Sequence, residues 1–96
     1  MSSYLIGVVD KKDLEKYQLY AAGGYEAIKG FDVAVTVAEQ PEVLEGKFPG
    51  TTLIIMKFKN KGDARKFYHS EAYQKVIPFR HASAATPFTV AFDSDD

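Results

Sequence analysis

The 96-residue sequence contains no cysteine, no tryptophan and no long hydrophobic run. Without cysteine the chain cannot form a disulfide, a thiol nucleophile, an iron–sulfur cluster or a cysteine-ligated zinc site. No apolar stretch approaches the roughly 20 residues that span a bilayer, and the first residues do not form a secretory signal. We therefore expect a cytoplasmic protein without a membrane partner, since a cysteine-free chain suits a reducing compartment.

An excess of charge of one sign is absent as well, because 12 Lys and Arg residues face 13 Asp and Glu residues. This balance argues against a general nucleic-acid or membrane-surface binder. Three of the acids lie in the last four residues, so we expect one domain over residues 1–92 and an acidic tail over residues 93–96. Between Lys57 and Arg80 the sequence has seven basic and two acidic residues, which either attract an anion or simply solvate a helix face.

Hydrophobic residues make up 46% of the chain, and their spacing predicts both strands and helices. Asp13 is expected to cap the first helix, and the Gly23-Gly24 pair within that helix is expected to kink or break it. Pro78 is expected to disturb the second helix, which Ser70 can cap again. The predicted elements are a strand over residues 4–9, a helix from Asp13 to Gly30, a strand over 31–38 with one well-buried face, a loop over 40–50, a strand over 51–59, a helix from Asn60 and a strand over 88–92.

The order β-α-β-β-α-β predicts an α+β fold of the ferredoxin-like type, with a four-stranded antiparallel sheet and both helices on one face. The third strand is apolar on both sides. If Ile54, Met56 and Phe58 face the helices, Leu53 and Ile55 lie on the open face of the sheet. Because a monomer seldom exposes a broad apolar patch, we expect a homodimer in which the open sheet face packs against a second copy.

Three kinds of site find no support in the sequence. Leu53 and Ile55 occupy the positions where an RNA-recognition domain of this order carries its stacking aromatics, so we expect no nucleic-acid partner. His69 and His81 are the only histidines, and they lack a metal-binding spacing. No glycine-rich phosphate loop or nucleophile elbow is present, and we expect neither a metal nor a cofactor.

A polar and aromatic cluster in the second helical region is the candidate site. A histidine side chain titrates near neutral pH, so His69 could act as a catalytic base, while Arg80 could hold a carboxylate through two hydrogen bonds. Tyrosine hydroxyls in this cluster could donate hydrogen bonds to a ligand. Each residue also has a structural alternative, as a core tyrosine, a helix cap or an ion-pair partner. The candidate ligand-binding residues are Tyr68, Ser70, Tyr73, Arg80 and Glu45, with Glu45 as a carboxylate base or a partner of Arg80.

Two segments resemble a family of small bacterial domains of unknown function, family thirteen-thirty. They are residues 67–74 with 77–80, and residues 43–50 followed by the strand over 52–58, and the likeness extends over residues 4–92. The resemblance implies a ferredoxin-like fold of the dimeric α/β-barrel superfamily, which includes cofactor-free monooxygenases, small isomerases and haem-binding enzymes. The residues that match the family pattern are Tyr68, Ser70, Tyr73, Arg80, Glu45 and Gly46, whereas Phe48 replaces a common tryptophan and Lys57 a common glutamate.

These observations leave three functions open. The first is an uncharacterised cytoplasmic homodimer that binds a small organic ligand, either a carboxylate or a phenol. The second is a cofactor-independent enzyme of the monooxygenase or isomerase type, with His69 as the base and Arg80 as the anchor of a substrate carboxylate. The third is a purely structural or interaction module. The sequence does not decide whether the protein is an enzyme.

Overall fold

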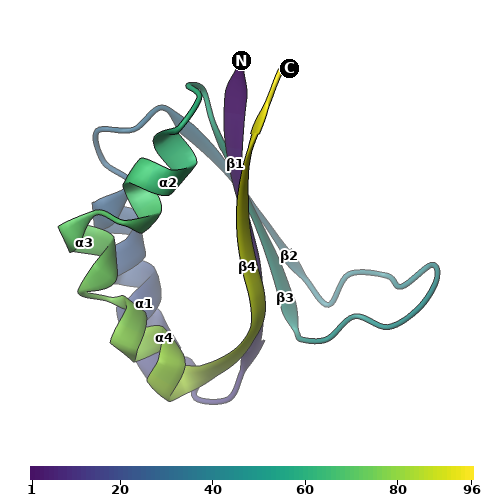
Figure 1. The fold of residues 1–96 in the computed structure, drawn as a ribbon. Helices are drawn as coiled ribbons and strands as arrows, with labels where there is room; N and C mark the ends of the chain where they lie inside the picture. The colour runs from purple at the N-terminus through teal and green to yellow at the C-terminus, as the bar shows by residue number, and fades with distance from the viewer.

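The computed structural model describes residues 1–96 and shows one sheet with helices on a single side (Figure 1). Its elements are β1 (Ser2–Lys11), α1 (Leu14–Ala27), β2 (Val33–Glu39), β3 (Thr52–Phe58), α2 (Asp63–Tyr68), α3 (Glu71–Gln74), α4 (Ile77–Ser83) and β4 (Ala84–Ser94). Neighbouring strands are antiparallel in the order β2-β3-β1-β4, which confirms the predicted ferredoxin-like α+β fold. None of the helices combines the length and the apolar composition that crossing a bilayer requires.

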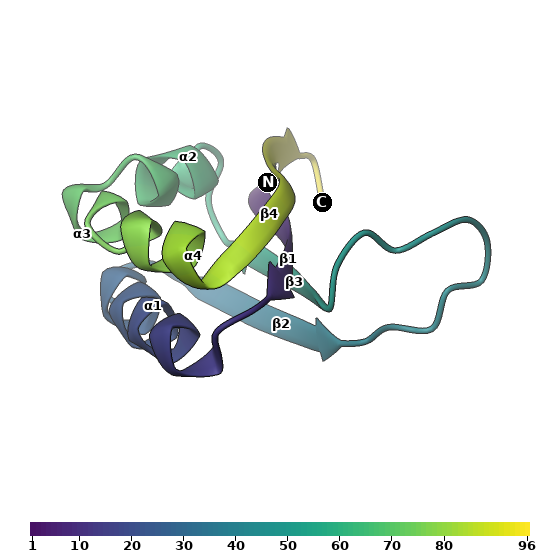
Figure 2. The ribbon, with the colours of Figure 1, turned by 90° about the horizontal axis from the view of Figure 1, so that it is seen from below.

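The sequence predicts a kink or a break at the glycine pair of the first helix, and the structure contradicts the break, because α1 runs through both glycines without interruption. Asp13 caps the helix as predicted, because its Oδ1 accepts a hydrogen bond from the Lys16 amide at 3.1 Å. A Cβ added to Gly23 would lie 2.2 Å from Val76 Cγ1, far inside van der Waals contact. Gly23 therefore allows α1 to approach the segment between α3 and α4. Figure 2 shows α1 beside α3 and α4.

The second helical region consists of three short helices instead of one interrupted helix. α2 begins at Asp63, later than predicted, because Gly62 before it has a left-handed φ of 81°. Ser70 caps α3 as predicted, and its Oγ accepts a hydrogen bond from the Tyr73 amide at 3.2 Å. Pro78 lies in the first turn of α4, where the missing amide proton of proline is no loss. The helix that Ser70 caps ends at Gln74 and α4 begins at Ile77, so the predicted interruption near Pro78 is confirmed.

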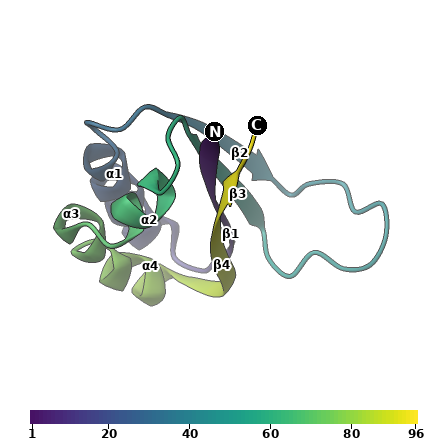
Figure 3. The same cartoon turned by 45° about the horizontal axis from the view of Figure 1, so that its top comes forward.

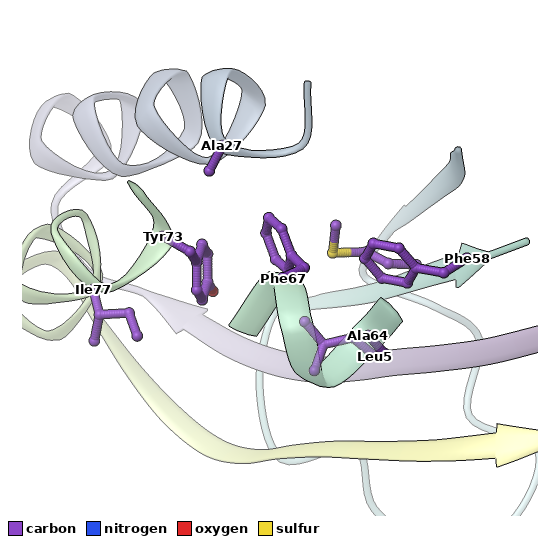
Figure 4. Close-up of a cluster of buried hydrophobic side chains, with 8 residues drawn as sticks. Leu5, Ala27, Phe58, Ala64, Phe67, Tyr73 and Ile77 are labelled. Carbon is purple, nitrogen blue, oxygen red and sulfur yellow. The ribbon is translucent and has the colours of Figure 1, made fainter. Parts of the chain in front are cut away.

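Buried side chains fill the space between the sheet and the helices (Figure 4). The rings of Phe58 in β3 and Phe67 in α2 are covered almost completely, with centroids 5.7 Å apart, and Tyr73 of α3 packs against Phe67. Met56 and Phe58 face the helices, as predicted. Because successive side chains of a strand alternate, Leu53 and Ile55 lie on the opposite face of the sheet, which no helix covers.

The last strand is longer than the sequence predicts. β4 runs from Ala84 to Ser94, so the expected boundary between domain and tail after residue 92 falls inside a strand. β4 is an edge of the sheet, and an edge strand tolerates Pro87 because its outer side has no ladder hydrogen bond to lose.

The edge strand β2 does not have the well-buried face that its alternation predicts. Val35 pairs with Met56 and so lies on the helix side, yet Val35 and Val37 are 46% and 54% exposed. The physical reason is that α1 leaves an apolar gap above this strand. On the other side of the sheet, the loop between β2 and β3 projects away from the helices (Figure 3).

Candidate ligand-binding site

An apolar cavity of about 420 Å³, open to solvent on the side where Tyr25, Val35 and Val37 are exposed, lies between α1 and the helix side of β2 and β3. Its floor is aliphatic and includes Val35, Val37 and Ile54, all from the sheet. A cavity of this volume is at the lower end of the range for small-molecule sites. Five aromatic side chains also line it: Tyr17, Tyr20, Tyr25, Phe67 and Tyr73.

Lys11 is the one charged residue that lines this cavity, and its charge is already neutralised. Its Nζ lies 2.8 Å from the Glu39 carboxylate and 4.8 Å from the centre of the Tyr17 ring. The hydrogen bond from Lys11, and to a smaller extent the one from Thr52, lowers the pKa of the Glu39 carboxyl below its usual value. The carboxylate of Glu39 therefore stays ionised beside Lys11 at neutral pH.

A second cavity, of about 30 Å³, adjoins the first near the centre of the sheet. Tyr20, Ile54, Met56 and Tyr73 line both cavities and so stand at their junction. Arg80 of α4 lines only the small one. These four side chains therefore lie between the apolar cavity and the small cavity at Arg80.

Two tyrosines hold the Arg80 side chain, which is only 4% exposed. Its Nη1 donates a hydrogen bond to Tyr73 Oη at 2.8 Å, and Tyr73 Oη lies 2.6 Å from Tyr20 Oη. The guanidinium carbon lies 5.6 Å from the centre of the Tyr20 ring, within the range of a cation–π contact. No carboxylate lies within ion-pair distance of Arg80, and its buried Nε has no hydrogen-bond partner.

Arg80, Tyr73 and Tyr20 together offer more hydrogen-bond donors than acceptors. Tyr73 Oη accepts from Arg80, and one hydrogen bond joins the two phenols, so one of their two hydroxyl protons has no acceptor among the three side chains. The Nε–H of Arg80 is a second unpaired donor. A buried donor without a partner costs about 1–3 kcal/mol, and a buried charge without a counter-ion costs more. The arrangement is suited to an acceptor that carries negative charge.

Burial keeps the phenols of Tyr73 and Tyr17 in their protonated form. It raises the pKa of Tyr73, as does the nearby phenol of Tyr20, and it raises the pKa of Tyr17 to about 12. Burial lowers the pKa of Arg80, but the phenols of Tyr73 and Tyr20 outweigh this effect, and the net direction is upward. At neutral pH the site therefore presents a cationic guanidinium beside phenol groups that can donate.

The structure brings three of the predicted site residues together. Tyr73 and Arg80 are joined by a hydrogen bond, and the half-buried ring of Tyr68 lies 5.7 Å from that of Tyr73. Ser70 is nearby in sequence, but its hydroxyl is committed to the α3 cap and to a 2.7 Å hydrogen bond with the Phe67 carbonyl. These contacts favour a structural role for Ser70, as a helix cap, over a role in ligand binding.

His69 and Glu45 lie elsewhere. His69 is exposed in a groove between α2 and β4, which Arg65 and Thr89 also line, and it does not line the cavity of Arg80. Glu45 is exposed in the loop between β2 and β3, which projects from the far side of the sheet (Figure 1), and it forms no ion pair with Arg80. The expected pairing of Glu45 with Arg80 is therefore wrong within one chain, because the sheet stands between them.

Sequence reasoning missed Tyr17 and Tyr20 as site residues. Their helical spacing with Ala21 and Ile28 marks them as core-facing, and nothing in that spacing shows that α1 stands off from the sheet. A usable signal was present, since two phenols on an apolar helix face bring hydroxyl groups that a dry core would have to satisfy.

Solved structures define the class of fold. A protein of unknown function from Rhodopseudomonas palustris matches with a TM-score of 0.74 and 10% identity, over 99% of this chain and 83% of that chain. SnoaB, a cofactor-independent oxygenase from Streptomyces nogalater, matches with a TM-score of 0.65 and 6% identity, over 99% and 94%. A dimeric protein of unknown function and ferredoxin-like fold from Bacteroides fragilis matches with a TM-score of 0.58 and 11% identity, over 97% and 96%. The chain thus has a ferredoxin-like fold.

Within that class, residues 2–92 match the family described as "Domain of unknown function (DUF1330)". The chain belongs to this family, as the motif around Tyr73 and Arg80 predicts. Among curated proteins, none matches the chain. The description of this family names no activity.

Proposed function

We propose that this protein binds a small organic acid, with the carboxylate against Arg80 and the apolar body in the adjoining cavity. The observation that supports this function is the buried charge of Arg80, which has an unpaired Nε–H and no carboxylate partner. A guanidinium presents its donors in a planar fork that matches a carboxylate. Lys11 is a poorer anchor because Glu39 already neutralises it.

The apolar cavity supplies the affinity that the ion pair alone does not. Taking a carboxylate out of water offsets much of its attraction to the guanidinium. Burying apolar surface contributes about 25 cal/mol per Å², so an acid with an apolar body gains binding free energy when that body packs against the side chains of the apolar cavity. The ligand class is therefore a monocarboxylate with an apolar body, rather than a short polar acid.

Isothermal titration with phenylpropionic acid, its primary amide and a phenol of similar size tests this function. The acid should bind, and the amide should bind at least tenfold more weakly, because it matches the acid in size but cannot balance the guanidinium charge. Arg80→Met should remove this preference, since methionine keeps the apolar stem and loses the charge.

Lys75→Met is the matched control, because Lys75 is an exposed cation of the same helical region that lines neither cavity nor the groove of His69. It should leave the titration unchanged, and circular dichroism should show that both variants are folded. An amide that binds as tightly as the acid, or an acid that binds Arg80→Met undiminished, would contradict the proposal. No binding by any of the three compounds would favour a structural or interaction module.

A cofactor-independent enzyme is the second candidate, and the position of His69 favours it. The groove that His69 lines shares Leu5 and Thr89 with the small cavity at Arg80, although His69 itself does not line that cavity. SnoaB, which has a similar fold, is a cofactor-independent oxygenase. Oxygen uptake or isomerisation of a bound acid that stops in His69→Ala, with binding retained, would support this candidate. Unchanged turnover in that variant would exclude His69 as the base.

We also propose that the open sheet face packs against a second copy of the chain. Phe88, Val90 and Phe92 of β4 are exposed there and extend the apolar surface of Leu53 and Ile55. The projecting loop carries Leu44, which is 83% exposed and could lie along a partner. One solved structure of this fold is described as dimeric. Light scattering should then give twice the chain mass of 10.7 kDa.

A cytoplasmic location is part of this proposal and is supported by the cysteine-free composition.

A further inference from the structure

Gly24 occupies a position in α1 where no backbone or packing requirement calls for glycine. It lies within the helix, and its φ is not in the left-handed region. A Cβ added to Gly24 would meet nothing within 4 Å, in contrast to one added to its neighbour Gly23. Glycine within a helix is less favourable than alanine by about 0.5–1 kcal/mol. The fold alone would therefore be served better by alanine at residue 24.

The empty space beside Gly24 belongs to the apolar cavity. Gly24 and Ala21 both line that cavity, and they lie between the larger Tyr20 and Ile28 along the same face of α1. This face therefore has a notch of two small residues in its middle. Opposite the notch, Ile54, Val35 and Val37 form the aliphatic floor.

The polar end of the site lies next to this notch. Tyr20 lines both cavities, and it precedes Gly24 by one helical turn. Arg80, which is 4% exposed and whose Nε–H has no partner, lines the small cavity beyond Tyr20. A carboxylate at Arg80 therefore directs the rest of an acid past Tyr20 and towards the space above the sheet.

We propose that Gly24 determines ligand specificity by leaving room for the far end of an extended, ring-bearing acid. The inference rests on the proposed binding of an organic acid and names its class, an arylalkanoic acid in which a methylene chain separates the ring from the carboxylate. The aromatic side chains that line the cavity favour a ring, which gains from edge and offset contacts. A short acid satisfies Arg80 without entering the notch, whereas a longer one places its ring against the helix backbone at Gly24.

A homologous series of phenylacetic, phenylpropionic and phenylbutyric acids tests the inference against Gly24→Leu and Gly24→Ala. In the unaltered chain the dissociation constant should fall about fourfold per added methylene group while the cavity fills. Gly24→Leu fills the notch, so it should weaken phenylbutyric acid at least tenfold and phenylacetic acid less than twofold. Gly24→Ala should raise the melting temperature and have an intermediate effect on the longest acid.

Ala22→Leu is the matched control, because Ala22 is an exposed residue of α1 that does not line the cavity. It adds a leucine to the same helix and should leave the whole series unchanged. An equal loss for all three acids in Gly24→Leu, or no loss for any, would overturn the role of Gly24 while leaving acid binding in place.

Xenon, which has no charge, separates the failure of this inference from the failure of the proposed function. If no acid binds the unaltered chain, the organic-acid function fails, and the chemical shift of ¹²⁹Xe still reports on the cavity. Xenon binding that Gly24→Leu abolishes and Ala22→Leu retains would support Gly24 as the residue that opens the cavity. Xenon binding that Gly24→Leu leaves intact would overturn that role independently of any acid.

Discussion

Arg80 and the tyrosines around it define the chemistry of the site at the scale of single residues. The guanidinium is held by a phenol oxygen and an aromatic ring, not by a carboxylate. Sequence reasoning selected Arg80 and Tyr73 because their side chains suit anion binding, and the structure places both at one cavity. It did not select Tyr20, because the helical spacing of that tyrosine marks a core-facing side chain without showing which partner its hydroxyl will meet.

The buried tyrosines predict a loss of stability in alkali. A tyrosine of the unfolded chain titrates near pH 10, whereas burial raises the pKa of Tyr17 to about 12 and also raises that of Tyr73. The unfolded state therefore loses these protons first as the pH rises. For Tyr17 the stabilising contribution is complete below pH 10 and is lost as the pH rises from about 10 to 12, by at most about 2 to 3 kcal/mol.

Urea unfolding at several pH values between 8 and 12 measures this decline, and Tyr17→Phe should make it shallower. Tyr25→Phe removes an exposed phenol of the same helix and should keep the slope of the unaltered chain. A slope that Tyr17→Phe leaves unchanged would show that its phenol titrates alike in the folded and unfolded states.

At the scale of elements, the close approach of α1 to the segment before α4 depends on Gly23. Gly23→Ala should destabilise the protein by about 1–3 kcal/mol, because its Cβ would overlap with Val76 Cγ1. Val76→Ala should recover most of this loss in the double variant, since it removes the overlapping methyl groups. A double-mutant cycle by urea unfolding measures the coupling. Additive effects of the two substitutions would contradict a contact between residues 23 and 76.

The elements themselves were largely predictable, and the spaces between them were not. The sequence of β3 predicted both the strand and which side chains lie on each of its faces. The Asp13 and Ser70 caps predicted where two helices begin. These signals were usable because they are local. The exposure of Val35 depends on where α1 lies, and the side of the sheet on which Glu45 lies depends on how the loop leaves β2. Neither is encoded in the spacing of nearby residues, so both required the structure.

At the scale of the whole molecule, the proposed dimer depends on the apolar open face of the sheet. Ile55→Lys places a charge at the centre of that face and should convert a particle of twice the 10.7 kDa chain mass into a monomer. Leu14→Lys is the control, because Leu14 is exposed on α1 away from that face, and it should leave the mass unchanged. Light scattering measures both variants.

Phe88→Lys guards against a failure of Ile55→Lys to fold, because Phe88 is already exposed at the edge of the same face. A monomeric mass for the unaltered chain at micromolar concentration would rule out the dimer. A dimeric mass that persists in folded Ile55→Lys and Phe88→Lys variants would rule out this face as the dimer interface.

The two ends of the sequence lie side by side. The Ser2 hydroxyl donates a hydrogen bond to the backbone oxygen of Asp96 at 3.0 Å, and both ends lie at the same end of the neighbouring strands β1 and β4 (Figure 1). A linker of a few residues could therefore join them and close the chain into a ring. New ends opened beside Leu44, in the projecting loop, would cut no strand or helix. The protein is in this sense a candidate for circular permutation, which would change the order of synthesis and leave the pairing of the sheet intact.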